Sequence, residues 1–212
     1  MNGRSYIFWD WNGTLLDDTS ACVGALNVML AKRGFETISY EYFRENFSFP
    51  ARNFYRLVGM DVPDEQWDAL AMEYHLEYSR QPAKLNAEAI AALETVKSRG
   101  IGQCVISALR QDKLDEDLRK YGLSQEFERI YGTDNLDGGS KLGRARELYE
   151  SLGRPRAVMI GDAIHDKEVA DALGVGCVLV ATGGHSVRRL SSVAPTAMTL
   201  LQAVGIAVRQ LI

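Results

Sequence analysis

Two aspartates follow short apolar runs near opposite ends of this sequence. Asp10 comes directly after the run 6–9 and just before an Asn-Gly turn, and Asp162 comes after the run 157–161. Buried strands of this kind present the next residue at the carboxyl edge of a sheet, where open α/β folds bind their ligands. A carboxylate at that edge can attack phosphorus and form an aspartyl-phosphate, so Asp10 is a candidate nucleophile.

A third carboxylate, Asp166, follows Asp162 after three residues. Carboxylates gathered beside Asp10 would repel one another unless a cation lay between them. Oxygen ligands next to a phosphate are the environment that Mg²⁺ prefers. The pattern therefore predicts a Mg²⁺ site, although Asp162 could instead be the N-cap of the helix that follows.

Ser107 and Lys141 occupy two further junctions between expected strands and helices. Ser107 follows the apolar run 104–106, and its hydroxyl and neighbouring backbone N–H groups could hold phosphate oxygens. Lys141 begins a helical stretch, where the helix dipole prefers an acid. This mismatch favours a role in neutralising phosphate or the nucleophile, and the alternative is a solvated surface lysine.

The elements that would position these groups alternate between strand and helix. Strands are expected at 5–9, 102–106, 127–131, 157–160 and 177–180, and helices at 87–99, 111–121, 141–151 and 167–173. Short apolar strands separated by helices are typical of a parallel sheet covered on both faces. We therefore expect an α/β fold with a Rossmann-like, doubly wound parallel sheet.

The segment between the first strand and Pro82 has a different character, with many aromatic residues and arginines. Helical spacing predicts helices at 19–33, 42–46, 51–58 and 64–78, with Asp64 as the N-cap of the last. We expect a core domain made of 1–17 and 82–212, and an all-helical cap domain over 18–81. Three cap arginines could reach an anionic substrate or form a solvated helix face: Arg44, Arg52 and Arg56.

The order and spacing of these motifs resemble the haloacid dehalogenase-like (HAD) hydrolase superfamily, most of all its phosphoglycolate-phosphatase-like subgroup with a helical cap. The resemblance implies that Asp10 is the nucleophile and a Mg²⁺ ligand, together with the backbone carbonyl of Asn12. It implies that Asp162 ligates Mg²⁺ and that Asp166 supports the site directly or through water. The groups expected to bind phosphate or substrate are Ser107, Lys141, Gly13, Thr14, Ala108 and Arg52.

Asn12 departs from the pattern of the family's phosphatases, which carry a second aspartate there. That aspartate protonates the leaving oxygen and then activates water, and an amide can do neither. Loss of a general acid/base typically costs about 10²–10⁴-fold in rate. Substitutes could be Asp17, Asp18 or His165, of which His165 is expected to be an exposed loop residue. An acyl or aryl phosphate would also need less acid, but it would not remove the need to activate water. The asparagine could be natural or an engineered substitution.

Several functions remain open at this point. The first is a Mg²⁺-dependent phosphatase of a small phosphorylated metabolite. The second is a non-catalytic protein that binds phosphorylated ligands, which Asn12 favours. A third is a phosphonate-cleaving relative with a Schiff-base lysine, for which Lys32 and Lys84 are the candidates. A receiver-like domain would also use aspartates and a lysine, but the insert after the first strand does not suit it.

Composition restricts the partners and the compartment. The chain has 212 residues with 46% hydrophobic and 25% charged residues and a net charge of −4. These are ordinary globular values without a basic excess, so no nucleic-acid partner is expected. Three widely spaced cysteines predict free thiols in the cytoplasm, and no apolar run is long enough to span a membrane. The aromatic-rich cap could be a substrate lid or a dimer face, so a monomer or homodimer is expected.

Overall fold

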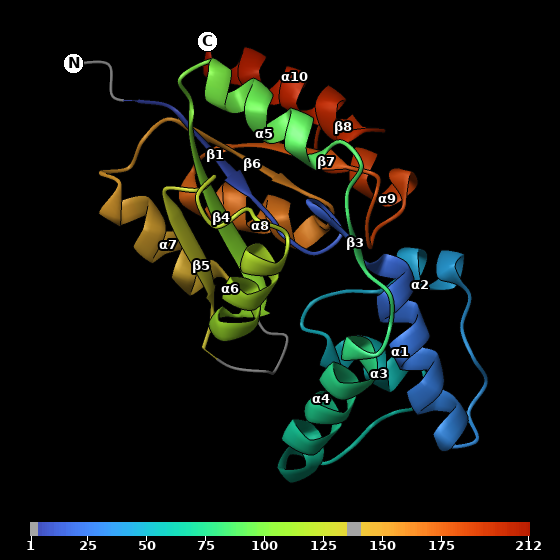
Figure 1. Cartoon of the computed structure of the whole chain (residues 1–212). Helices are drawn as coiled ribbons and strands as arrows, with labels where there is room; N and C mark the ends of the chain where they lie inside the picture. The colour runs from blue at the N-terminus through green and yellow to red at the C-terminus, as the bar shows by residue number, and fades with distance from the viewer. Residues whose placement is uncertain (1–3, 135–140) are drawn as a thin grey trace.

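A six-stranded parallel sheet forms the centre of the computed structural model, which describes residues 4–134 and 141–212 (Figure 1). The strand order is β5-β4-β1-β6-β7-β8, with β1 at an interior position. The strands are β1 (Tyr6–Trp9), β4 (Gly102–Arg110), β5 (Arg129–Thr133), β6 (Ala157–Gly161), β7 (Gly176–Val180) and β8 (Thr196–Ala197). The expected α/β fold with a doubly wound parallel sheet is therefore confirmed.

Helices cover both faces of this sheet. One face packs against α5 (Ala89–Ser98), α6 (Gln111–Lys120) and α10 (Leu200–Leu211). The other face packs against α7 (Leu142–Ser151), α8 (Ile164–Leu173) and the short α9 (Val187–Ser191). Because both faces are buried, the strands are almost continuously apolar, which is the pattern that made them recognisable.

Four helices lie together beside the carboxyl edge of the sheet, away from its two faces (Figure 1). They are α1 (Thr19–Lys32), α2 (Tyr40–Asn46), α3 (Arg52–Leu57) and α4 (Asp64–Ser79), and they share a separate aromatic-rich core. We call these four helices the cap. The chain enters the cap through β2 (Leu16–Asp17) and leaves it through β3 (Lys84–Leu85), which pair antiparallel.

Several local predictions were wrong in detail. Pro63, rather than Asp64, is the N-cap of α4, and Asp64 lies in the first turn, where it complements the helix dipole. Strand β4 extends to Arg110, with a shift of register against β5 between Ile106 and Arg110.

No helix within residues 4–134 and 141–212 is long and apolar enough to cross a membrane.

Candidate active site

The carboxyl ends of three adjacent strands meet at one point of the sheet edge. Trp9 at the end of β1 is in register with Val105 of β4 on one side and Ile160 of β6 on the other. The residues that follow therefore converge, and Asp10 and Asp162 lie at this edge as the sequence predicted. The chain runs from β1 to β4 and β5 and then crosses to β6, so this is the topological switch point where open α/β sheets bind ligands.

Lys141 is the cation at the centre of this edge. Its ammonium forms ion pairs with the Asp10 and Asp166 carboxylates, the latter at 2.7 Å, and donates a hydrogen bond to the Ile106 carbonyl oxygen at 3.1 Å. Only 2% of Lys141 is exposed. A lysine buried to this extent between two carboxylates is not a solvated surface residue. Burial disfavours its charge, but Asp10 and Asp166 outweigh that effect and raise its pKa.

Three carboxylates at this edge could hold a metal ion. Oxygen atoms of Asp10, Asp162 and Asp166 all lie within 4.8 Å of one another, and all three residues are buried. Burial raises the pKa of Asp10 to about 7 despite the opposing charge of Lys141. Burial, together with repulsion from Asp10 and Asp166, raises the pKa of Asp162 well above its usual range. One lysine cannot balance three carboxylates, so a hard divalent cation such as Mg²⁺ fits this donor set.

Asp162 is held in a narrow space between two loops. The Gly184 N–H donates a hydrogen bond to its carboxylate. A side chain at Gly13 or at Gly183 would overlap the Asp162 carboxylate, and Gly13 also has φ +77°, which favours glycine. Ala163, and not Asp162, is the N-cap of α8. The side chain of Asp162 is therefore available as a ligand, and the alternative role as a helix cap is excluded.

Thr14 and Ser107 flank the nucleophile in different ways. The Thr14 hydroxyl donates to Asp10 at 3.2 Å, but Thr14 is fully buried and does not line the adjoining pocket. Thr14 therefore positions Asp10 and was predicted to bind phosphate or substrate, a role for which the pocket gives no support. The Ser107 hydroxyl accepts a hydrogen bond from the Leu109 N–H at 3.0 Å, and Ser107 and Ala108 both line the pocket. The register shift in β4 occurs here, as is common beside active sites.

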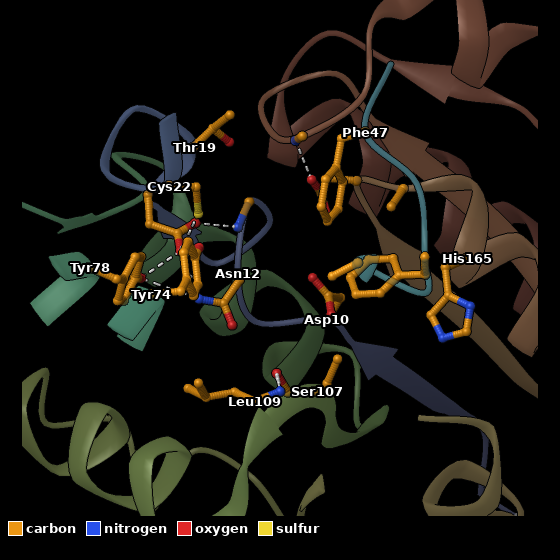
Figure 2. Close-up of a pocket in the computed structure, with 18 of the residues that line it drawn as sticks. Asp10, Asn12, Thr19, Cys22, Phe47, Tyr74, Tyr78, Ser107, Leu109 and His165 are labelled. Atoms are coloured by element: carbon orange, nitrogen blue, oxygen red, sulfur yellow. Dashed lines mark hydrogen bonds between the residues drawn. The ribbon is translucent and has the colours of Figure 1, made fainter. Parts of the chain in front are cut away.

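The side chain of Asn12 is held by a network on the cap side. Its Nδ2 donates to the Asp18 carboxylate at 2.7 Å, and the same carboxylate accepts from Tyr78 Oη at 2.6 Å and from the Gly13 N–H at 2.8 Å. Figure 2 shows Asn12 between Tyr78 and Asp10. Because the nitrogen faces a carboxylate, the amide oxygen is directed away from it. Asn12 can therefore orient a hydrogen-bond donor such as water, but cannot take its proton.

The three proposed substitutes for the missing acid/base have different surroundings. Asp17 is half-exposed and lies 3.4 Å from Lys84 in the strand pair that leads to the cap. Asp18 is buried and lines the pocket, and burial raises its pKa although its hydrogen-bond donors oppose this. His165 is buried in α8, with its Nε2 accepting from the Lys141 N–H, so the expectation of an exposed loop histidine was wrong.

Comparison with known proteins settles the family. The family described as haloacid dehalogenase-like hydrolase matches residues 7–180. The chain belongs to the haloacid dehalogenase-like hydrolases. It is 28% identical over 193 residues to a phosphoglycolate phosphatase of Caulobacter vibrioides, covering 86% of this chain and 81% of that one. It is 26% identical over 185 residues to the tyrosine-protein kinase PtkA of Mycobacterium tuberculosis, covering 84% of this chain and 62% of that one.

Solved structures of other haloacid dehalogenase-like proteins share the fold. A family member from Streptococcus pneumoniae superposes with a TM-score of 0.80 at 18% identity, covering 97% of this chain and 98% of that one. A predicted phosphoglycolate phosphatase from Haemophilus somnus superposes with a TM-score of 0.74 at 15% identity, covering 97% and 98%. At these identities the likeness establishes the architecture of the hydrolase, including its helical cap.

A pocket of about 190 Å³ leads from Asp10 of the hydrolase into the cap. Its floor is formed by Asp10, Ser107, Lys141, Asp162 and Asp166, and Gly13 and Asn12 lie at its side. Its cap end is mainly aromatic, with residues from α1, α2, α3, α4 and the segment 47–51. Sequence reasoning noted the aromatic content of this region but did not assign these residues to a pocket, because their spacing is equally compatible with a helix core.

The cap arginines of the hydrolase lie outside the pocket lining. Arg52, which was predicted to bind substrate, donates to the Val62 carbonyl oxygen at 2.8 Å and pairs with Asp64. Arg44 donates to three carbonyl oxygens of the segment 181–185, and Arg56 contacts Asp61. None of these three described side chains lines the pocket. Each guanidinium instead binds carbonyl or carboxylate oxygens of the protein itself.

The candidate Schiff-base lysines also lie elsewhere. Lys32 is half-exposed and pairs with Glu77 at 2.7 Å, and Lys84 is largely exposed beside Asp17. Among the described residues that line the pocket, Lys141 is the sole lysine, and it is engaged by Asp10 and Asp166. The structure therefore gives no support to phosphonate cleavage through a cap lysine.

Proposed function

We propose that this hydrolase is a Mg²⁺-dependent phosphatase of a small phosphorylated metabolite that acts through an aspartyl-phosphate on Asp10. The observation that carries the proposal is the buried cluster of Asp10, Asp162 and Asp166 around Lys141, at the end of a pocket open to the cap. The family supports hydrolysis, and two relatives are named phosphoglycolate phosphatases, from Caulobacter vibrioides and Synechococcus elongatus.

Each residue of the cluster has a distinct task in this proposal. The Asp10 carboxylate attacks phosphorus while Thr14 holds its other oxygen. Lys141 stabilises negative charge on the phosphoryl oxygens, and Asp166 orients the Lys141 ammonium. The Ser107 hydroxyl hydrogen is available for a phosphoryl oxygen, since its oxygen already accepts from Leu109. Mg²⁺, held by Asp10, Asp162 and the Asn12 carbonyl, would neutralise the phosphate and favour ionised Asp10.

The amide of Asn12 makes the proposed reaction slow. It can orient a water molecule through its oxygen, but an amide does not titrate, so proton transfer is lost. A missing general acid/base corresponds to about 10²–10⁴-fold in rate. We expect turnover numbers well below those of phosphatases that carry aspartate at this position.

Phosphate release from a panel of phosphate esters, with Mg²⁺ and with EDTA, tests this proposal. Release should require Mg²⁺ and should be abolished by Asp10→Asn, which preserves the shape of the side chain. Asp17→Asn is the matched control because Asp17 is half-exposed and does not line the pocket. Folding of each variant is checked by circular dichroism. Release that persists in folded Asp10→Asn would contradict the mechanism.

A second candidate function is Mg²⁺-dependent binding of phosphorylated ligands without turnover. The observation that favours it is the hydrogen bond from Asn12 Nδ2 to Asp18, which fixes a non-titrating group beside the nucleophile. Binding detected by calorimetry, with no phosphate released over a day, would favour this function. Asp10-dependent release would exclude it.

We also propose a cytoplasmic location. Cys22, Cys104 and Cys177 are free thiols, as expected in a reducing compartment. Burial raises the pKa of Cys104 to about 12, so this thiol is protonated and inert at neutral pH. Cell fractionation of the tagged protein would test the assignment.

A further inference from the structure

We propose that the substrate is a phosphate monoester of an aryl or similarly apolar group, and that this group occupies the cap end of the pocket. This assignment rests on the proposed phosphatase function. It differs from the activity for which two relatives are named, because phosphoglycolate carries a carboxylate in place of an apolar group.

The first observation is the chemistry of the pocket wall. Beyond Asp10, seven aromatic rings from the cap helices and the segment 47–51 line it: Phe43, Phe47, Phe49, Tyr55, Trp67, Tyr74 and Tyr78. Leu26, Ala51 and Ala71 add apolar surface, and the polar residues of this part of the wall are Asp18, Thr19, Cys22 and His75. Figure 2 shows Phe47, Tyr74 and Tyr78 around the space above Asp10 and Ser107. Walls of this kind favour rings, because apolar burial and aromatic contacts both contribute.

The second observation is the state of the basic groups in the pocket. Among the described lining residues they are Lys141, Arg110, His75 and His165. Lys141 is engaged by Asp10 and Asp166, and Arg110 is held by both carboxylate oxygens of Asp112 at 2.5 and 2.6 Å. A substrate carboxylate in the cap would therefore have no guanidinium or ammonium group to neutralise it, and its desolvation would oppose binding.

The third observation is the amide at Asn12, which is independent of the pocket wall. When Asp10 oxygen attacks phosphorus, the bond to the ester oxygen breaks, and that oxygen leaves with the electron pair. A phenolate can leave without a proton, because phenols have a pKa near 10. An alkoxide is far more basic and needs an acid, which Asn12 cannot provide. Water then attacks phosphorus, the bond between phosphorus and the Asp10 oxygen breaks, and the Asp10 carboxylate is regenerated. The protons of the water leave with the product, as dihydrogen phosphate.

The size of the pocket agrees with one ring and a phosphoryl group. The cavity measures about 190 Å³. An apolar cavity of roughly 150 Å³ is large enough to hold benzene. The same pocket excludes substrates with several rings or a long chain unless the cap moves.

Binding of two unreactive phosphonates tests the pocket without the influence of leaving-group chemistry. With Mg²⁺ at pH 8, phenylphosphonate should have a Kd about 10–100-fold lower than methylphosphonate, as expected for burial of one aromatic ring. Phe49→Ala should reduce this ratio several-fold. Phe35→Ala is the matched control, since Phe35 is a cap phenylalanine that is 42% exposed and outside the pocket. Equal Kd values for the two phosphonates would overturn the assignment.

Turnover provides the second arm of the test. At pH 8, kcat/KM should be at least about 100-fold higher for phenyl phosphate than for 2-phosphoglycolate. Benzyl phosphate should exceed ethyl phosphate, although both leave as alkoxides. Asp10-dependent turnover that favours 2-phosphoglycolate would overturn the aryl assignment alone. No Asp10-dependent turnover of any ester would overturn the proposed phosphatase function, and the substrate assignment with it.

Discussion

The substitution Asn12→Asp tests whether a general acid/base at position 12 raises the rate and what it costs in stability. In the structure, Asn12 Nδ2 lies 2.7 Å from a carboxylate oxygen of Asp18. Replacing that nitrogen by oxygen places two carboxyl groups at hydrogen-bonding distance inside a largely buried network. We expect the variant to gain a general acid/base and to lose stability at neutral pH.

The magnitude of the stability loss follows from the geometry. Two unit charges 2.7 Å apart repel by about 6 kcal/mol at an effective dielectric constant of 20. Protonating one carboxyl is less costly. With an ordinary pKa near 3.9, protonation costs about 4 kcal/mol at pH 7 and about 1.5 kcal/mol at pH 5. The shared proton raises the pKa of the pair in the folded state, so the destabilisation should grow as pH rises and shrink as pH falls.

Urea unfolding at pH 5 and pH 7, combined with turnover of ethyl phosphate, measures both effects. We expect a destabilisation of at most about 4 kcal/mol at pH 7 that falls by about 2.5 kcal/mol at pH 5. Turnover should rise by about 10²–10⁴-fold. The double variant Asn12→Asp/Asp18→Asn exchanges the two groups and should keep the gain in rate while recovering stability.

Two results would refute this reasoning. Equal destabilisation at both pH values would mean that the two carboxyl groups do not share a proton. Unchanged turnover of ethyl phosphate in the folded variant would mean that proton transfer at this position does not limit the rate. Asp18→Asn alone is the control for loss of the carboxylate, because it leaves the amide at position 12 in place.

Three further predictions concern the metal site and its surroundings. The pKa of Asp10 is about 7 in the folded protein and near 3.9 in the unfolded chain, so the metal-free protein should lose stability as pH rises from about 4 to 7. The increase in Tm on adding Mg²⁺ should therefore be larger at pH 8 than at pH 6. An equal increase at both pH values would contradict the raised pKa of Asp10. Lys141→Met should reduce turnover, measured by phosphate release, by about 10²–10³-fold. It should also destabilise the fold by about 3–5 kcal/mol at pH 7, measured by urea unfolding. Normal turnover of this variant would exclude Lys141 from the active site. Tyr78→Phe removes the hydroxyl that donates to Asp18 and should cost about 1.5–3 kcal/mol in urea unfolding, whereas a change within 0.5 kcal/mol would show that this hydrogen bond contributes little.

The central strands could be predicted because their signals are local. An apolar run such as 157–160 and a glycine such as Gly174, which ends α8 with φ +69°, act within a few residues. The carboxyl edge of a parallel sheet then brings Asp10 and Asp162 together without further information. The strand β8 was missed because its two residues are too few for a hydrophobic pattern, and α10 was missed because Gly205 interrupts its helical pattern.

The surroundings of the site could not be predicted, because they depend on partners distant in sequence. Arg44 donates to the carbonyl oxygens of residues more than a hundred positions away, and no local pattern encodes that contact. The burial of His165 results from Lys141 and from the ring of Phe49, whose centroid lies 5.0 Å away. The role of Asp18 likewise becomes visible only when Tyr78 of α4 is placed beside it.

The segment 181–185 connects the position of the cap with the metal site. Arg44 of α2 donates hydrogen bonds to the carbonyl oxygens of Ala181, Gly183 and His185. The Gly184 N–H of the same segment donates a hydrogen bond to the Asp162 carboxylate. Any opening of the cap that withdraws Arg44 therefore releases the loop that orients a predicted Mg²⁺ ligand. By thermodynamic linkage, a cap that closes on its ligand should tighten Mg²⁺ binding, and Mg²⁺ should favour closure by the same factor.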